Sequence, residues 1–133
     1  MKKIILLIIF FSFSFSFQNV EATKKNILQL HKQNITIIDI RTPPEWQATG
    51  TIPFAKKITF FTKKGINRSF IELLRLNKLD KKSNFAIICR TGHRSKVASE
   101  ILEKNGFKHI INLKGGMFRL FKDMLKNDFK GGK

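Results

Sequence analysis

Short apolar runs of strand length alternate with amphipathic segments along most of the chain. Residues 35–40 (ITIIDI), 85–89 (FAIIC) and 109–113 (HIINL) are apolar and β-branched almost throughout. Such unbroken runs are typical of strands that are covered on both faces, as in a parallel sheet. We therefore predict a strand in each run, and a shorter fourth strand over residues 57–61 (KITFF).

Apolar residues recur at helical spacing in four further segments, which are residues 26–32, 67–76, 95–105 and 117–125. Asn67 is a candidate N-cap for the second of these helices, and Gly106 is expected to end the third. Residues 45–48 allow a single helical turn, and residues 128–133 are expected to fray. The order of strands and helices along the chain is the feature that decides the fold class.

Strands that alternate with helices predict an α/β fold with three layers, helices lying on both faces of a mostly parallel central sheet. The 133 residues are enough for one domain with one core, and 42% of them are hydrophobic. Ligands of such sheets gather at the carboxyl ends of the strands. Cys89 stands at one of those ends, so the chemistry is sought there.

The first 22 residues have the plan of a secretory signal peptide. Lys2 and Lys3 supply positive charge, and residues 4–17 form an apolar run that is broken only by three serines. Val20 and Ala22 occupy the two positions that a signal peptidase recognises. Cleavage is therefore expected after Ala22.

Cleavage there would leave one domain of residues 23–133, with a core of about residues 26–127. The apolar run has 14 residues, fewer than the ~20 that a membrane-spanning helix needs, so no stable membrane span is expected after processing. The protein is expected to be exported to the periplasm or the cell exterior. An uncleaved leader that acts as an anchor remains the alternative.

Cys89 is the only cysteine of the chain, so no internal disulfide can form. A lone thiol that is exported to an oxidising compartment is either buried and inert or kept for its reactivity. Cys89, His93 and His109 lack the close spacing of metal ligands, and neither a metal nor another cofactor is predicted.

The net charge is +17, from 26 Lys and Arg against 9 Asp and Glu, which favours anionic partners in general. The basic residues are spread along the chain, mostly in pairs, with no run of five. The chain has no tyrosine and one tryptophan, so aromatic stacking on bases is poorly supplied. We interpret the charge as a lysine-rich solvent surface and predict no nucleic-acid partner.

Residues 89–95 (CRTGHRS) join a buried strand to a helix and carry the candidate chemistry. A loop that curls into a helix N-terminus turns several backbone N–H groups toward one point and forms an anion cradle. A sulfur at the centre of this cradle is stabilised as a thiolate, and Arg90 and Arg94 add full positive charges. Gly92 allows a backbone conformation or a close approach that a side chain would block.

Residues 85–98 resemble the active-site segment of rhodanese domains, with an apolar strand, a cysteine, a mid-loop glycine, arginine-serine and an alanine-bearing helix. Further matches follow the family's order, and they are Asp39-Ile40-Arg41, Glu45-Trp46 with Gly50, Gly106-Phe107 and residues 113–117 (LKGGM). Thr51 departs from the pattern, since the family often has histidine at that position. The resemblance covers residues 35–125.

The resemblance implies a five-stranded sheet and transfer of sulfane sulfur through a persulfide on Cys89. It implies substrate contacts from the rest of the loop, namely Arg90, Thr91, Gly92, His93, Arg94 and Ser95. Among these, Arg94 in the first place and Arg90 in the second would hold the oxyanion end of a donor such as thiosulfate, and the loop N–H groups would stabilise the persulfide. Asp39 and Arg41 would support the loop and not react.

With a single thiol, the persulfide must pass its sulfur to an external acceptor, which is cyanide, a small thiol or a partner protein. The partners expected are thus a small sulfur-donor anion and an acceptor of unknown identity, for a protein that is expected to be a monomer. One alternative is a rhodanese-fold binding or sulfur-carrier module without turnover, although such modules usually lose the cysteine. A phosphatase is less favoured, because the related phosphatases have five residues between cysteine and arginine, and Cys89 and Arg94 are separated by four.

Overall fold

The central sheet has five parallel strands, in the spatial order β1-β7-β6-β2-β3. The structure is a computed structural model that describes residues 17–131, with side chains up to residue 128. The five strands are β1 (Gln18–Glu21), β2 (Thr36–Asp39), β3 (Lys56–Lys57), β6 (Asn84–Ile88) and β7 (His109–Lys114). A separate antiparallel pair is formed by β4 (Phe61–Thr62) and β5 (Gly65–Ile66).

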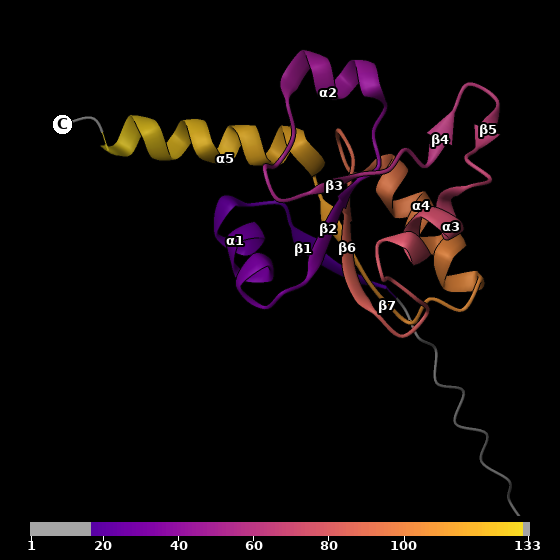
Figure 1. Cartoon of the computed structure of the whole chain (residues 1–133). Helices are drawn as coiled ribbons and strands as arrows, with labels where there is room; N and C mark the ends of the chain where they lie inside the picture. Colours follow the sequence, from indigo (N-terminus) through magenta and orange to yellow (C-terminus); the bar gives the residue numbers. More distant parts are fainter. Residues whose placement is uncertain (1–16, 132–133) are drawn as a thin grey trace, which may run out of the picture.

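Helices cover both faces of the sheet (Figure 1). The five helices are α1 (Lys24–Lys32), α2 (Pro43–Thr49), α3 (Phe70–Leu76), α4 (His93–Lys104) and α5 (Gly116–Gly131). Helices α1 and α5 lie on one side, α3 and α4 lie on the other, and α2 follows the carboxyl end of β2. The prediction of a three-layer α/β fold with a five-stranded sheet is confirmed.

Alternate residues of each buried strand point to opposite sides of the sheet and enter two separate clusters. On β6, Ile87 belongs to the cluster beneath α3 and α4, whereas Ala86 and Ile88 belong to the cluster beneath α1 and α5. All three side chains are completely buried. This two-sided burial is the reason why the strand sequence is apolar without alternation.

The strand predicted over residues 57–61 is wrong for most of its length. Only Lys56–Lys57 pairs with β2, and Phe61–Thr62 turns away to pair with β5. Between them, the N–H groups of Ile58 and Phe60 still donate to the carbonyls of Asp39 and Ile40. The segment therefore follows the sheet edge through isolated hydrogen bonds, and its apolar side chains enter the core.

All five helices differ from the predicted boundaries at one or both ends. Helix α3 begins at Phe70 with Ser69 as its N-cap, and Asn67 instead accepts a hydrogen bond from the Ser69 N–H. Helix α2 begins at Pro43, since the first turn of a helix needs no N–H there.

The expectation that residues 128–133 fray is wrong as far as residue 131, because α5 continues to Gly131. Residues 132–133 lie outside the described part. The far half of α5 extends away from the rest of the molecule (Figure 1).

No strand was predicted for residues 18–21, yet they form β1 at the edge of the sheet, paired with β7 from Gln18↔Ile111 to Glu21↔Lys114. Ala22, the next residue, has no exposed surface. The stretch lies within the 22 residues assigned to the signal peptide, of which residues 1–16 are outside the described part. The cleavage position therefore stays a prediction. Strand β1 bears on it, because cleavage after Ala22 would remove the strand.

Among residues 17–131, none of the helices has the length and apolar content required to cross a membrane.

Candidate active site

Cys89 directly follows β6, which lies between β7 and β2 in the middle of the sheet. The short connection from β6 to α4 thus starts at the carboxyl edge, where the prediction put the chemistry. The Cys89 residue is buried, with 1% of its surface exposed. A reagent can therefore reach the sulfur only from the side of the loop that surrounds it.

Two backbone N–H groups of the loop donate to the Cys89 sulfur. The Gly92 nitrogen lies 3.1 Å from Sγ and the Ser95 nitrogen lies 3.4 Å from it. The Ser95 hydroxyl lies 3.4 Å from Sγ and donates to the Gly92 carbonyl at 3.2 Å. Because Gly92 caps α4, the sulfur occupies the N-terminal end of a 12-residue helix, where unpaired N–H groups favour negative charge.

A double glycine at the start of α5 holds the backbone of the same loop at its first two residues. The N–H groups of Met117 and Phe118 donate to the carbonyls of Cys89 and Arg90, each at 2.9 Å. In a trans peptide the C=O and the following N–H point in opposite directions. Fixing these two carbonyls toward α5 therefore turns the next N–H groups of the loop away from α5.

This contact requires glycine at residue 116. Gly116 has φ +62°, and a Cβ there would lie 2.5 Å from the Cys89 carbonyl oxygen and 2.6 Å from that of Arg90. Gly92 has φ +96°, and a Cβ there would lie 2.8 Å from the nitrogen of Gly115. The loop and the turn before α5 are therefore packed backbone against backbone.

Arg94, in the first turn of α4, is already engaged by an acidic partner. Its guanidinium makes two hydrogen bonds to the carboxylate of Glu45 on α2, at 2.6 and 2.7 Å. Hydrogen bonding to Arg94 lowers the pKa of Glu45 from 4.5 to about 2, and the same bonds raise the pKa of Arg94. The pair connects α2 to the start of α4. The positive charge of Arg94 is thus neutralised by a carboxylate of the same protein.

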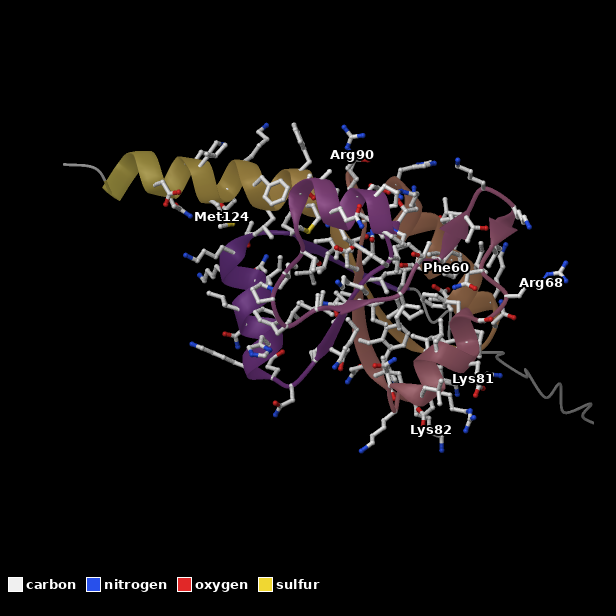
Figure 2. The ribbon with its side chains drawn as sticks, turned by 45° about the horizontal axis from the view of Figure 1, so that its top comes forward. Phe60, Arg68, Lys81, Lys82, Arg90 and Met124 are labelled. Carbon is white, nitrogen blue, oxygen red and sulfur yellow. The ribbon has the colours of Figure 1, made fainter. Side chains whose placement is uncertain are left out.

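Arg90 differs from Arg94 in exposure. It lies on the outer rim of the loop with Thr91 and His93, and all three residues are exposed. Figure 2 shows its side chain directed away from the ribbon at the end where the loop lies. Its guanidinium is therefore available to an anion from solvent.

A hollow of about 400 Å³ opens beside the loop. It is lined by Arg41, Glu45, Ala48, Thr49, Arg90, Met117, Phe118 and Phe121. One wall is thus aromatic and comes from α5, while Arg90 contributes a cation at the edge. A small ligand that has both an anionic group and an apolar part fits this combination of surfaces.

Asp39 and Arg41 form a buried ion pair at the end of β2, with residue exposures of 0% and 1%. The shortest of their contacts, from Arg41 Nη2 to Asp39 Oδ2, is 2.8 Å. Arg41 also donates to the Thr49 hydroxyl and the Gly50 carbonyl, each at 2.7 Å. These bonds hold the carboxyl end of α2, the helix whose first turn contains Glu45. This geometry suits the supporting role expected of Asp39 and Arg41.

Thr51 completes this network. Its hydroxyl donates to Asp39 Oδ2 at 2.7 Å. A hydroxyl thus supplies a hydrogen bond at the position where the resemblance led us to expect histidine.

The seven predicted loop residues lie around or beside the sulfur. Asp39 and Arg41 lie behind the loop, buried at the end of β2. Two contacts were not predicted from sequence. They are the ion pair of Arg94 with Glu45 and the packing of the double glycine against the loop backbone. Glu45 and Gly116 had been noted only as parts of the family pattern. Among the described residues, no cluster of three or more His, Cys, Asp or Glu is arranged to hold a metal.

Comparison with known proteins gives a consistent family match. The family model for the rhodanese-like domain matches residues 23–122. A sulfurtransferase of Allochromatium vinosum is 31% identical over 85 residues, which cover 64% of this chain and 70% of the relative.

Two solved structures give similar backbones. A rhodanese-like domain protein from Staphylococcus aureus is 30% identical, with a TM-score of 0.57, covering 77% of this chain and 89% of the other. The polysulfide-sulfur transferase homodimer of Wolinella succinogenes is 26% identical, with a TM-score of 0.60, covering 81% of this chain and 75% of the other.

Proposed function

Because the chain belongs to the rhodanese-like domain family, we propose that it transfers sulfane sulfur from a small anionic donor to an external acceptor through a persulfide on Cys89. The main support is the sulfur's position at the N-terminus of α4, with the N–H groups of Gly92 and Ser95 as donors. Donors aimed at a site of negative charge stabilise both the attacking thiolate and the persulfide anion.

The first half-reaction loads the enzyme. The Cys89 thiolate attacks the outer sulfur of thiosulfate, a new S–S bond forms to Cys89, and the S–S bond of thiosulfate breaks. Sulfite leaves with the electron pair of that bond. Arg90 holds the sulfonate oxygens during this step, since it is exposed at the rim while Arg94 is occupied by Glu45.

The second half-reaction unloads it. A nucleophile such as cyanide attacks the outer sulfur of the persulfide, thiocyanate departs, and the Cys89 thiolate is restored. A thiol acceptor would take the same sulfur and become a persulfide itself. Since Cys89 is the only cysteine, the acceptor must come from outside the chain.

Burial of Cys89 supports a small donor. With 1% of the residue exposed, the sulfur lies at the bottom of the loop, and a bulky reagent has no direct approach. Thiosulfate presents a single sulfur atom on a compact sulfonate. The hollow beside Arg90 offers room for the remainder of a somewhat larger donor or acceptor.

The test is turnover of thiosulfate and cyanide to thiocyanate by wild-type protein and by Cys89→Ser. We expect activity in the wild type and none in the variant, with equal folding by circular dichroism. If the two proteins are equally inactive with thiosulfate, polysulfide and persulfidated glutathione, the sulfurtransferase proposal fails. The protein would then be a binding or carrier module.

We also propose that the protein works outside the cytoplasm. The support is the sequence of the first residues, with Lys2 and Lys3 before an apolar run. Fractionation of a bacterial host that expresses the full chain tests this localisation, and recovery in the cytoplasm alone would contradict it.

A further inference from the structure

The folded domain starts earlier than the cleavage position suggested by sequence. Phe17 packs against the cluster beneath α3 and α4, and its backbone nitrogen lies 2.8 Å from Glu103 Oε2 on α4. The two residues are 86 positions apart in the chain. The segment just before β1 is thus attached to the body of the protein.

Strand β1 is joined to the sheet along its whole length. It pairs in parallel with β7 over four residues, and the Ala22 N–H then donates to the Lys114 carbonyl at 3.0 Å. Ala22 is completely buried in the cluster beneath α1 and α5, against which Val20 also packs. The strand lies at the edge of the sheet and leads into α1.

A buried amide depends on the same strand. Asn112 of β7 has 2% of its surface exposed, and its Nδ2 donates to the side-chain oxygen of Asn19 at 2.9 Å. Its own oxygen, Oδ1, has no hydrogen-bond partner among the described residues. Without Asn19 the buried Nδ2 would lose this acceptor, and a buried polar group without a partner destabilises the fold.

Cleavage after Ala22 would remove all of these contacts. The product would lack β1, leave the edge of β7 unpaired and open the cluster that Ala22 fills. A sheet edge with unpaired backbone groups is also a site of aggregation. The fold therefore requires that any cleavage fall before β1.

A second cleavage sequence stands at the required place. Ser14 and Ser16 have small side chains at the two positions that a signal peptidase recognises, with Phe15 between them. An apolar stretch of residues 4–11 and the two lysines precede this triplet, as a signal peptide requires. Cutting here leaves the whole strand in the product.

We propose that a signal peptidase hydrolyses the bond between Ser16 and Phe17. This inference rests on the export proposed above and is independent of the sulfur chemistry. Water adds across the peptide bond, so that Ser16 takes the new carboxylate and Phe17 takes the new amine. The amine is protonated at neutral pH and lies where the Phe17 nitrogen now meets Glu103, so the hydrogen bond from an amide to a carboxylate becomes an ion pair.

The experiment is expression of the full chain, residues 1–133, in a Gram-negative host, followed by intact mass and N-terminal sequencing of the periplasmic product. A product that begins at Phe17 supports the proposal. A product that begins at Thr23, or an uncut chain in the membrane fraction, overturns it. Uncut protein in the cytoplasm overturns both export and this inference, while thiocyanate formation by the same sample tests the sulfurtransferase proposal separately.

Two matched variants locate the cut. Ser16→Gln puts a larger side chain at the position before the scissile bond and should reduce processing at least tenfold. Ser12→Gln makes the same change four residues earlier and should leave processing unchanged. Equal processing of the two variants, or a product of Ser16→Gln that begins at Thr23 with wild-type yield, would overturn the proposal.

Discussion

The inner and outer sides of the Cys89 loop differ in how their polar groups are used. On the inner side, the Gly92 and Ser95 amides face the sulfur, and Arg94 is bound to Glu45. On the outer side, Arg90, Thr91 and His93 are exposed. The difference suggests a division of labour, in which the inner side holds the reacting sulfur and the outer side selects the donor.

The largest expected effect comes from moving the inner side through its backbone. Gly116→Ala forces a methyl group within 2.5 Å of the Cys89 carbonyl oxygen, so the loop must shift. We expect thiosulfate turnover to fall by roughly 100-fold, since small displacements of a reacting group have effects of this order. Steady-state kinetics measures the loss.

Gly65→Ala is the matched control for Gly116→Ala. Gly65 also has a positive φ, +108°, but a Cβ there meets no atom within 4 Å. The control introduces backbone strain in the β4–β5 hairpin without touching the loop. Equal activity loss in the two variants would show that strain, and not the packing of α5 on the loop, is responsible.

A smaller effect is expected from the outer side. Arg90→Ala should raise the KM for thiosulfate about tenfold, as loss of one exposed charge-assisted contact is worth about 1.4 kcal/mol. The kcat should change by less than about twofold, because the thiolate and its donors are intact. Lys96→Ala removes a neighbouring exposed cation of α4 and should leave the KM unchanged. A fall in kcat at constant KM would contradict the division of labour.

The link between α2 and α4 is expected to matter less for binding than for stability. Glu45→Gln should lower the free energy of unfolding at pH 7 by about 1 kcal/mol, the scale of a partly exposed ion pair. The pKa of Glu45 is about 2 in the folded protein against 4.5 normally, so its contribution is complete above pH 4.5 and disappears as the pH falls toward 2.

Urea titrations of the wild type and Glu45→Gln at several pH values test this link. The stability difference between the two proteins should shrink below pH 4.5. A constant difference across this range would mean that the carboxylate charge is not what stabilises the contact.

The smallest effect is expected from Ser95→Ala. The change removes the hydroxyl 3.4 Å from the sulfur but leaves both amide donors. We expect kcat to fall about threefold to fivefold, because the bond from this hydroxyl to the Gly92 carbonyl, which helps to hold the loop, is lost. Ser99→Ala is the control, since the Ser99 hydroxyl is also buried on α4 but donates to the Ser95 carbonyl. Its kcat should stay at the wild-type value.

The local parts of the site were predictable from sequence, and the long-range parts were not. An apolar strand, Cys89, Gly92 and a helix are consecutive, so their geometry follows from the chain itself. The partner of Arg94 is Glu45, 49 residues away, and only the tertiary structure brings α2 and the start of α4 close enough for this contact. The pairing of α5 with the loop is likewise a product of tertiary structure.

Edge strands of the sheet were the least predictable part of the fold. Strand β1 is mostly exposed and reads QNVE, so it lacks the apolar pattern of the buried strands. It also overlaps the sequence that resembles a cleavage region. At the opposite edge, Ile58 and Phe60 are buried by core packing without forming a regular strand.

The central claim is that the Cys89 sulfur, held by the inner side of the loop, accepts one sulfur atom. The direct measurement is intact mass of the protein after brief exposure to thiosulfate and removal of excess reagent. We predict an addition of one sulfur atom on the wild type that a thiol reductant removes, and no addition on Cys89→Ser. A wild-type mass that does not change at any thiosulfate concentration, with the protein folded, would contradict the account.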